Sequence, residues 1–593
     1  MKNVLSTFAM LAVLGVLGYF GWSYYQSKER AAEPLTGDGF LAPEKQQVIW
    51  DAEHVTFEVE HRLGKAFLEA WQSQDVKKLT SLLHPDFQAV LPQTTEWTVI
   101  SKPPLEEKIR LSPRLDEEPL TADTNEFLKV LLDPIRDVKI KKKKLRVLKI
   151  SDMGKGLWSC RFLLAGSGVD GNSVSRHYES EHDVCLEIKD EKKLGEAASI
   201  LQWEVRTETQ RRCDKPIMEE ITSLLGLDQS GLKDNWDLEK GKAQQHNFQV
   251  AVEDFDLDND LDISVMTVDG KRYLFAFEDG KYKNVTKELG IPMAGMDPMQ
   301  MDIFSTAWID IDNDGYPELI SGARVFKNIR GELFKDITTE TRLLFDPEVM
   351  GLNVVDFNND GFLDLYVVYQ RPYGIAAKTD EGREAASQQA RWIDEETSGK
   401  VNELFKNNGD GTFRMETLLS GTGGGKRHSQ AAAWFFYDDD IYPDVYIAND
   451  FGKNVLLRNG GPGEPFEDVS VESGTNGFAT SMGVVAGDVD NDGESDLFVA
   501  NMFSKMGRRI IEMVSPEDYT PEVHSQIVGS CAGNRLYRRT GPDGKYEDSS
   551  VASGVNEVGW AWAPTMADLD SDGWLDLYST SGFMSFDRKK PDG

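Results

Sequence analysis

Residues Asp310–Glu318 read DIDNDGYPE, with oxygen-bearing side chains at positions 1, 3, 5 and 9 and glycine at position 6. The pattern returns as DFDLDNDLD from Asp254, with asparagine in place of the usual glycine, and as DFNNDGFLD from Asp356, DVDNDGESD from Asp488 and DLDSDGWLD from Asp568. One further copy, FYDDDIYPD from Phe436, is the fourth of the six loops in chain order, and it lacks the first acidic residue and the glycine. An apolar run follows each copy, as LDLYVV follows the third. Repetition at this scale indicates one structural unit used several times.

The five complete loops have the composition of calcium sites. Ca²⁺ takes six to eight oxygen ligands from a sharply turning loop, and glycine permits the positive φ of such a turn. Solvated acidic turns are the alternative. They are disfavoured because two carboxylates about 4 Å apart repel by roughly 4 kcal/mol at an effective dielectric of 20. An EF-hand is excluded because position 12 is Val or Ser instead of Glu. The predicted ligands are Asp254, Asp256, Asp258, Asp262, Asp310, Asp312, Asp314, Glu318, Asp356, Asn358, Asp360, Asp364, Asp488, Asp490, Asp492, Asp496, Asp568, Asp570, Asp572 and Asp576.

A second repeated phrase lies between the loops. It reads RVFKNIRGELFKDITTE from Arg324 and ELFKNNGDGTFRMETLL from Glu403, and each copy predicts a β-hairpin. One loop with its strand and one hairpin make a blade of about four strands, so residues 246–593 predict a calcium-binding β-propeller of six or seven blades. Insertions at 370–402 and 502–533 are candidate places for contact with a partner.

The N-terminus predicts a membrane anchor within residues 1–25, because Val4–Tyr25 is free of charge and long enough to cross about 30 Å of hydrocarbon. A cleaved signal peptide is the alternative, although the aromatic-rich end is more typical of an interfacial belt. Residues 26–50 are polar and predict a tether. Weak calcium sites need extracellular calcium, so we expect the bulk of the chain to be extracytoplasmic, periplasmic or at the cell surface.

Residues 51–215 predict an α+β domain, with helical periodicity first and alternating strands afterwards. The phrase AFLEAWQSQDVKKLTSLLHPDF, residues 66–87, resembles the NTF2-like (SnoaL-type) fold, and residues 216–245 read as a connector. That resemblance implies a cone-shaped pocket. Its candidate lining residues form no fixed constellation, so we predict no catalytic residue: they are His84, Asp86, His177, Tyr178, Glu181 and His182.

Composition excludes some classes of protein. The net charge of −35 argues against nucleic-acid binding, which depends on basic surfaces. The four cysteines fit no zinc site, and a single disulfide is possible among Cys160, Cys185 and Cys213. The basic run VKIKKKKLRVLKI, residues 138–150, could meet anionic lipid or a polyanion, but it is more typical of a lysine-protected edge strand.

The loops and hairpins resemble the FG-GAP/VCBS repeats of integrin α-type propellers. The phrases NMFSKMGRRI (501–510) and GNRLYRR (533–539) are similar to the cartilage acidic protein-like family. This resemblance implies a seven-bladed, extracytoplasmic, calcium-binding propeller. The family's usual C-terminal domain does not follow Asp576, so either the segment before Asp254 completes the last blade or the natural protein is longer. We expect an anchored module for adhesion or for binding a protein or glycan, and not an enzyme; the alternative is a membrane-bound enzyme with a pocket in the first domain or on a propeller face.

Overall fold

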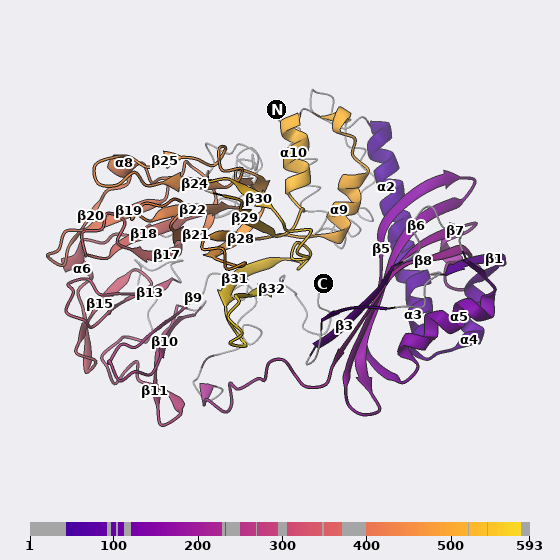
Figure 1. Cartoon of the computed structure of the whole chain (residues 1–593), viewed down its shortest axis with the longest axis horizontal. Coiled ribbons are helices and arrows are strands. Elements are labelled where there is room, and N and C mark those ends of the chain that lie inside the picture. Colours follow the sequence, from indigo (N-terminus) through magenta and orange to yellow (C-terminus); the bar gives the residue numbers. More distant parts are fainter. Residues whose placement is uncertain are drawn as a thin grey trace, which may run out of the picture. The chain divides into compact units, whose positions relative to one another are not determined.

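The computed structural model describes residues 43–91, 97–101, 105–111, 120–227, 232, 249–267, 270–293, 305–346, 349–370, 399–519, 521–541 and 544–582. They form two compact units, and most of their regular structure is β-sheet (Figure 1). The repeat unit comprises Ile221–Arg508 and Pro516–Gly593, and the second unit comprises Leu41–Glu220 with Arg509–Ser515. Within these ranges no helix has the length and apolar character of a membrane span. The predicted span Val4–Tyr25 lies outside the described residues.

Among the described residues of the repeat unit, five antiparallel sheets of four strands succeed one another. Their strands are β9 (Gln249–Glu253), β10 (Asp262–Met266), β11 (Arg272–Glu278), β12 (Lys281–Asn284), β13 (Thr306–Ile309), β14 (Glu318–Ser321), β15 (Arg324–Ile329), β16 (Leu333–Asp336), β17 (Val349–Val355), β18 (Asp364–Tyr369), β19 (Glu403–Asn407), β20 (Phe413–Met415), β21 (Ser429–Phe435), β22 (Asp444–Asn449), β24 (Val455–Arg458), β25 (Glu467–Asp468), β27 (Ser481–Gly487), β28 (Asp496–Asn501), β29 (Arg535–Arg539) and β30 (Tyr546–Asp548). A sixth sheet pairs β31 (Ala561–Ala567) with β32 (Asp576–Ser581), and β23 (Gly452–Lys453) pairs with β26 (Phe478–Ala479).

Each sheet repeats the same order: a first strand, the acidic loop, a second strand and then a hairpin of two strands. The first strands of successive sheets are neighbours, from β9 and β13 through to β27 and β31. Apolar side chains fill the space between each pair of sheets. Between the first two sheets, for example, Phe255 and Trp308 stack with ring centroids 6.0 Å apart. The predicted hairpins are therefore confirmed, and burial between sheets holds them in series.

Short helices accompany the repeats, and two lie in the predicted insertion 502–533. The helices are α6 (Thr338–Thr341), α8 (Thr417–Ser420), α9 (Lys505–Glu512) and α10 (Pro521–Gly529). The other predicted insertion falls almost entirely on residues 371–398, which lie outside the described residues.

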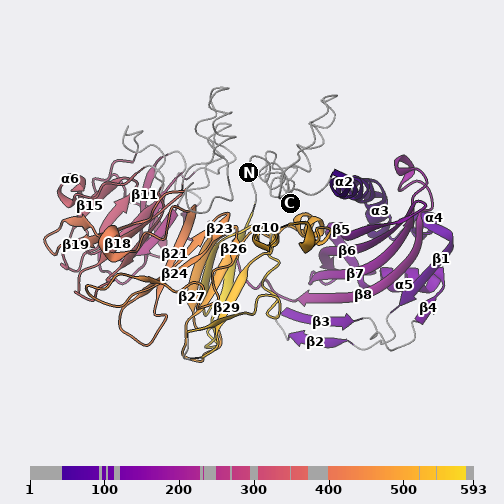
Figure 2. The same cartoon turned by 90° about the horizontal axis from the view of Figure 1, so that it is seen from above.

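The second unit has helices and an eight-stranded sheet. Six of its strands follow the path β2-β3-β8-β7-β6-β5 (Figure 2), and off this path β1 pairs with β8 and with β4. Its elements are α2 (Pro43–Glu58), a π-helical turn (Val59–Gly64), α3 (Lys65–Gln72), α4 (Val76–Leu82), β1 (Leu83–Leu91), β2 (Thr98–Ser101), β3 (Leu105–Leu111), β4 (Leu120–Ala122), α5 (Thr124–Leu132), a 3-10 turn (Asp133–Ile135), β5 (Val138–Gly154), β6 (Leu157–Asp170), β7 (Ser175–Glu187), a 3-10 turn (Glu191–Lys193) and β8 (Ile200–Cys213). Helix α2 starts at Pro43, inside the stretch predicted as tether, since proline favours the first turn of a helix.

A single aromatic core joins the helices to this sheet. Trp71 of α3 and Trp203 of β8 are fully buried, and Phe67 stacks on Trp203 at 5.2 Å. The basic run Val138–Ile150 lies in β5, at one end of the sheet path, so its prediction as an edge strand is confirmed. All four cysteines are free thiols, so the structure contains no disulfide among them.

Candidate metal centres

The acidic loops have one architecture throughout the repeat unit. Each loop joins the first strand of its sheet to the second, and position 9 is the first residue of that second strand. Position 9 therefore has the fixed backbone of a sheet, while positions 1 to 8 form the turn. The ligands of one loop come from a rigid strand and from a turn that folds back on it.

The carboxylate at position 1 organises the turn. In the second loop, Asp310 accepts the backbone N–H groups of Asp314 at 3.2 Å and Gly315 at 2.9 Å. The same pair of bonds occurs at the other complete loops, with Asp254, Asp356, Asp488 and Asp568 as acceptors. The chain thus wraps around position 1 in all five complete copies.

Two residues of each turn except the fourth have left-handed backbone. In the second loop they are Asn313 at position 4, with φ 56°, and Gly315 at position 6, with φ 88°. The role of glycine at position 6 was predicted, and in the first loop Asn259 takes its place with φ 73°. Asparagine tolerates this conformation better than most residues with a β-carbon. The requirement at position 4 was missed, although the recurrent Asn there could have indicated it.

The position-4 asparagines also connect neighbouring loops. Asn313 donates from Nδ2 to the carbonyl of Gly361 in the third loop at 2.8 Å. Asn359 makes the equivalent bond to Ile441 in the fourth loop at 2.8 Å, and Asn491 reaches Gly573 in the sixth at 3.1 Å. These bonds brace one loop against the next.

The carboxylate at position 9 is buried in the first five loops. Glu318 is 0% exposed and accepts the N–H of Ile311 at 2.8 Å, and Asp364 accepts the N–H groups of Phe357 and Asn407. Burial raises the pKa of Asp262 to about 6 and that of Glu318 and Asp364 to about 7. A buried carboxylate with a raised pKa gains from a neighbouring cation, which favours its ionised form.

Four loops bring three carboxylates together, with one oxygen of each within 4.8 Å of the others. The groups are Asp254, Asp256 and Asp262; Asp310, Asp312 and Glu318; Asp488, Asp490 and Asp492; and Asp568, Asp570 and Asp572. The remaining predicted residues of these loops, Asp258, Asp314, Asp496 and Asp576, are outside the groups.

The surroundings of Asp256 indicate whether a cation fits the first loop. Its Oδ1 is buried without a hydrogen-bond partner, and burial with the neighbouring Asp258 charge raises the pKa of its carboxyl. A buried acceptor of this kind is costly unless something binds it. The first loop therefore fits Ca²⁺, with Asp254, Asp256 and Asp262 converging as hard oxygen ligands.

A lysine of the hairpin occupies the centre of the second loop. Lys327 on β15 places Nζ 2.8 Å from Asp314 and 3.1 Å from Glu318. At the equivalent position of the third sheet, Lys406 lies 2.6 Å from Asp360, and in the fifth sheet Arg538 contacts Asp490. In the first sheet the strand register places Ala276 at the position of Lys327, so the first loop has no cationic side chain from that position of its hairpin.

The third, fourth and sixth loops each lack a feature of the first two loops: convergent carboxylates, left-handed backbone or burial of the acidic residues. The third presents Asp356, Asn358, Asp360 and Asp364 and contains no group of three convergent carboxylates among its described residues. The fourth keeps a buried Asp444, but its described positions 4 and 6, Asp439 and Ile441, lack the left-handed backbone. In the sixth the acidic residues are exposed.

The residues considered for catalysis in the second unit do not converge. Only His177 and Tyr178 line its cavity. His84 pairs with Glu187 at 3.2 Å and lies 3.7 Å from the exposed carboxylate of Asp86, outside the cavity lining. His182 is buried in the core beside Trp203, where desolvation lowers its pKa to about 3. It stays neutral there, and it bonds Ser180 at 2.8 Å.

Comparison with protein families finds the FG-GAP-like repeat at residues 254–321, 437–499 and 522–579. The chain contains FG-GAP-like repeats. These three segments include loops one and two, the fourth and fifth loops and the sixth loop, respectively, together with parts of the surrounding sheets.

No curated protein sequence matches the chain. Among solved structures, it is similar to a lectin of Agrocybe aegerita that is described as recognising non-reducing terminal N-acetylglucosamine. The identity is 16%, the TM-score is 0.33, and the match covers 56% of this chain and 74% of the lectin.

Proposed function

We propose that this chain is a membrane-anchored, extracytoplasmic, calcium-binding β-propeller that acts as a protein- or glycan-binding or adhesion module. The observation that carries the proposal is the recurrence of one turn geometry around convergent carboxylates at successive FG-GAP-like repeats. In this reading calcium is structural: it fixes the loops that join the strands of each blade.

Contacts between successive sheets support the propeller. Asn328 of the second sheet donates to the carbonyl of Phe255 in the first loop at 2.8 Å, and Asn407 of the third reaches Ile311 in the second loop at 2.8 Å. Asn459 of the fourth sheet continues the series to Phe357 at 2.7 Å. The second, third and fourth sheets thus each satisfy a backbone carbonyl of the preceding acidic loop. Regular contacts from one sheet to the next are what radial repetition of blades requires.

Burial of the ligands supports calcium as a structural ion. A carboxylate held at the start of a strand, such as Asp262 or Glu318, has little freedom to rearrange. A metal that takes part in catalysis keeps an open coordination position, whereas these ligands are committed to the turn. The rigid surface made by loops and hairpins is then available for a macromolecular ligand, which is a role we favour over an enzymatic one.

The extracytoplasmic location rests on calcium availability and on the apolar N-terminal segment. Extracellular modules bind calcium at about 10⁻⁴–10⁻³ M, a range that cytosolic free calcium does not reach. Protease added to intact cells, or to spheroplasts if an outer membrane is present, should digest the repeat region. Digestion that occurs only after lysis would contradict this location.

Calcium binding and ligand binding are tested together. Native mass spectrometry of the chain in millimolar calcium should show several bound ions that a chelator removes. Binding to a glycan array and to immobilised extracellular proteins should then be stronger in calcium than in chelator. A chain that binds no calcium at millimolar concentration, or whose ligand binding does not depend on calcium, would contradict the proposal.

A further inference from the structure

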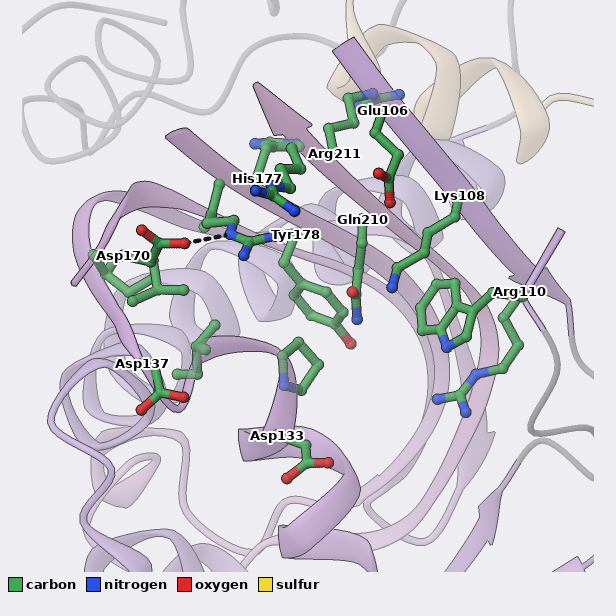
Figure 3. Close-up of a pocket in the computed structure, with 18 of the residues that line it drawn as sticks. Glu106, Lys108, Arg110, Asp133, Asp137, Asp170, His177, Tyr178, Gln210 and Arg211 are labelled. Carbon is green, nitrogen blue, oxygen red and sulfur yellow. Dashed lines mark hydrogen bonds and ion pairs between the residues drawn. The ribbon is translucent and has the colours of Figure 1, made fainter. Parts of the chain in front are cut away.

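The second unit has an open cavity of about 740 Å³. Figure 3 shows side chains of β3, β7 and β8 pointing into it from one side, with Asp133 and Asp137 from the opposite side. Its volume is within the range of about 300–1,000 Å³ that is typical of small-molecule sites. The acidic loops of the repeat unit contribute none of its lining residues.

The walls of the cavity are chemically different. One wall comes from α5, the 3-10 turn and β5; its apolar residues are Val130, Pro134, Ile135, Val138 and Ile140, and the exposed carboxylates of Asp133 and Asp137 also belong to it. The opposite wall comes from β3 and β8, where side chains of alternate residues share a face. In that wall, Lys108 lies opposite Gln210 and Arg110 lies opposite Glu208.

Most charged groups on the polar wall are already paired. Glu208 is 1% exposed and accepts from Arg110 Nε at 2.7 Å and from the Tyr178 hydroxyl at 3.0 Å. Arg176 donates to Asp170 at 2.9 Å, as the dashed line in Figure 3 marks, and Arg211 donates to Glu107 at 3.1 Å. Glu106 lies opposite Arg212 in the strand register, but Arg212 donates to Asp214 at 2.8 Å. The paired groups therefore contribute little net charge.

Lys108 differs from these groups. Among the described residues its ammonium makes no ion pair, and its cross-strand partner Gln210 is neutral. It lies 5.1 Å from the centre of the Trp97 ring, which Arg110 also contacts at 4.9 Å. In a chain with a net charge of −35, an ammonium in a pocket that has no carboxylate partner among the described residues is a local attraction for anions.

We propose that this cavity binds a small amphipathic organic anion. Its single anionic group would be bound by Lys108 and by the amide of Gln210, and its apolar body would pack on Ile135, Ile140 and the Trp97 ring. An apolar pocket with a few convergent polar groups is the usual form of a small-molecule site, and the polar groups set the orientation of the ligand. The site acts independently of the calcium loops.

Two fluorescent probes that differ in one anionic group test the proposal. The full chain is titrated with 8-anilinonaphthalene-1-sulfonate and, separately, with uncharged N-phenyl-1-naphthylamine. The sulfonate should bind saturably at one site and more tightly than the neutral probe. Lys108→Gln should weaken binding of the sulfonate by about tenfold or more, the size of a lost charge-assisted hydrogen bond, and should leave the neutral probe unchanged.

A matched variant separates a local effect from a general effect of charge. Lys77→Gln removes the same charge from an exposed position on α4, outside the cavity lining, and should leave both titrations unchanged. Trp97→Leu should weaken both probes, because both would stack on that ring. The proposal is overturned if the sulfonate does not bind, if Lys108→Gln has no effect on it, or if Lys77→Gln weakens it equally. Equal loss of both probes in Lys108→Gln would indicate a neutral ligand instead.

Discussion

The ammonium nitrogen of Lys327 lies 2.7 Å from each carboxylate oxygen of Asp312. It also reaches Asp314 and Glu318, so one side chain contacts three of the four predicted calcium ligands of the second loop. Calcium would have to displace this ammonium to reach those oxygens. The lysine and the ion are therefore competitors for the same site, and repeats with and without such a lysine should differ in calcium affinity.

Lys327→Gln should tighten calcium binding at the second loop. The substitution removes the competing charge, so the metal-free chain becomes less stable while calcium adds more stability than it does in the wild type. The measurement is the melting temperature of the full chain across a calcium titration. Lys335→Gln, which removes an exposed lysine of β16, is the control and should change neither quantity. A calcium-dependent gain that stays at the wild-type value in Lys327→Gln would show that the lysine does not compete.

Asp256→Asn should reduce the stability that calcium provides at the first loop. Ligand binding adds RT ln(1 + [L]/Kd), about 2.7 kcal/mol when calcium is a hundredfold above Kd. Asp256 is one of three convergent carboxylates, so its loss should remove much of that gain in millimolar calcium. Asp438→Asn in the fourth loop is the matched change and should alter the gain little, because Phe436 replaces the ligand at position 1 there. Equal losses in the two variants would show that the fourth loop binds calcium as well.

The calcium-dependent gain should shrink between pH 8 and pH 6. Burial raises the pKa of Glu318 and Asp364 to about 7 in the metal-free fold, above their unfolded values. The folded state then binds more protons than the unfolded state between about pH 4 and 7, so this contribution to stability is present at low pH and is lost as the pH rises through 7. Calcium needs the ionised carboxylates, and protons compete with it. Melts with and without calcium at each pH measure the gain, and a constant gain would contradict the raised pKa values.

The sequence predicted the acidic loops and hairpins because their chemistry is local. Position 1 accepts backbone N–H groups only four and five residues away, so one short segment such as Asp310–Gly315 contains both partners of each bond. Contacts between repeats are different. The bond from Asn313 to Gly361 and the approach of Lys327 to Asp312 depend on the register of strands and on the next sheet. No pattern within one loop encodes these distances.

The cavity of the second unit was only partly predictable. Tyr178 and His182 share one face of β7, as their alternation predicts, yet only Tyr178 lines the cavity. Farther along the strand the same face meets the aromatic core, so His182 packs against Trp203. Lys108 was not singled out, because a lone lysine in an alternating strand is indistinguishable from a solvated one until its cross-strand partners are known.

Arg509→Ala should destabilise the second unit by about 3 kcal/mol, whereas Arg508→Ala should change stability by about 0.5 kcal/mol or less. Arg509 belongs to the short segment Arg509–Ser515 that clusters with that unit. It is 5% exposed, donates to both carboxylate oxygens of Glu53 at 2.8 and 2.7 Å, and also bonds the carbonyl of Val147. Its removal leaves a half-buried carboxylate and a carbonyl without this partner.

Arg508 is a close control for that substitution, because it is the same residue type one position earlier. It is paired with Glu557, but both side chains are 46% exposed, so water can replace the lost contact. Urea unfolding of the full chain, followed by tryptophan fluorescence to which the buried Trp71 and Trp203 of the second unit contribute, measures both variants. The loss should be the same in calcium and in chelator, since none of the convergent carboxylate groups found among the described residues lies in the second unit. A similar loss in the two variants would mean that burial of the Arg509 pair contributes nothing, and a loss confined to calcium would place the effect in the repeat unit.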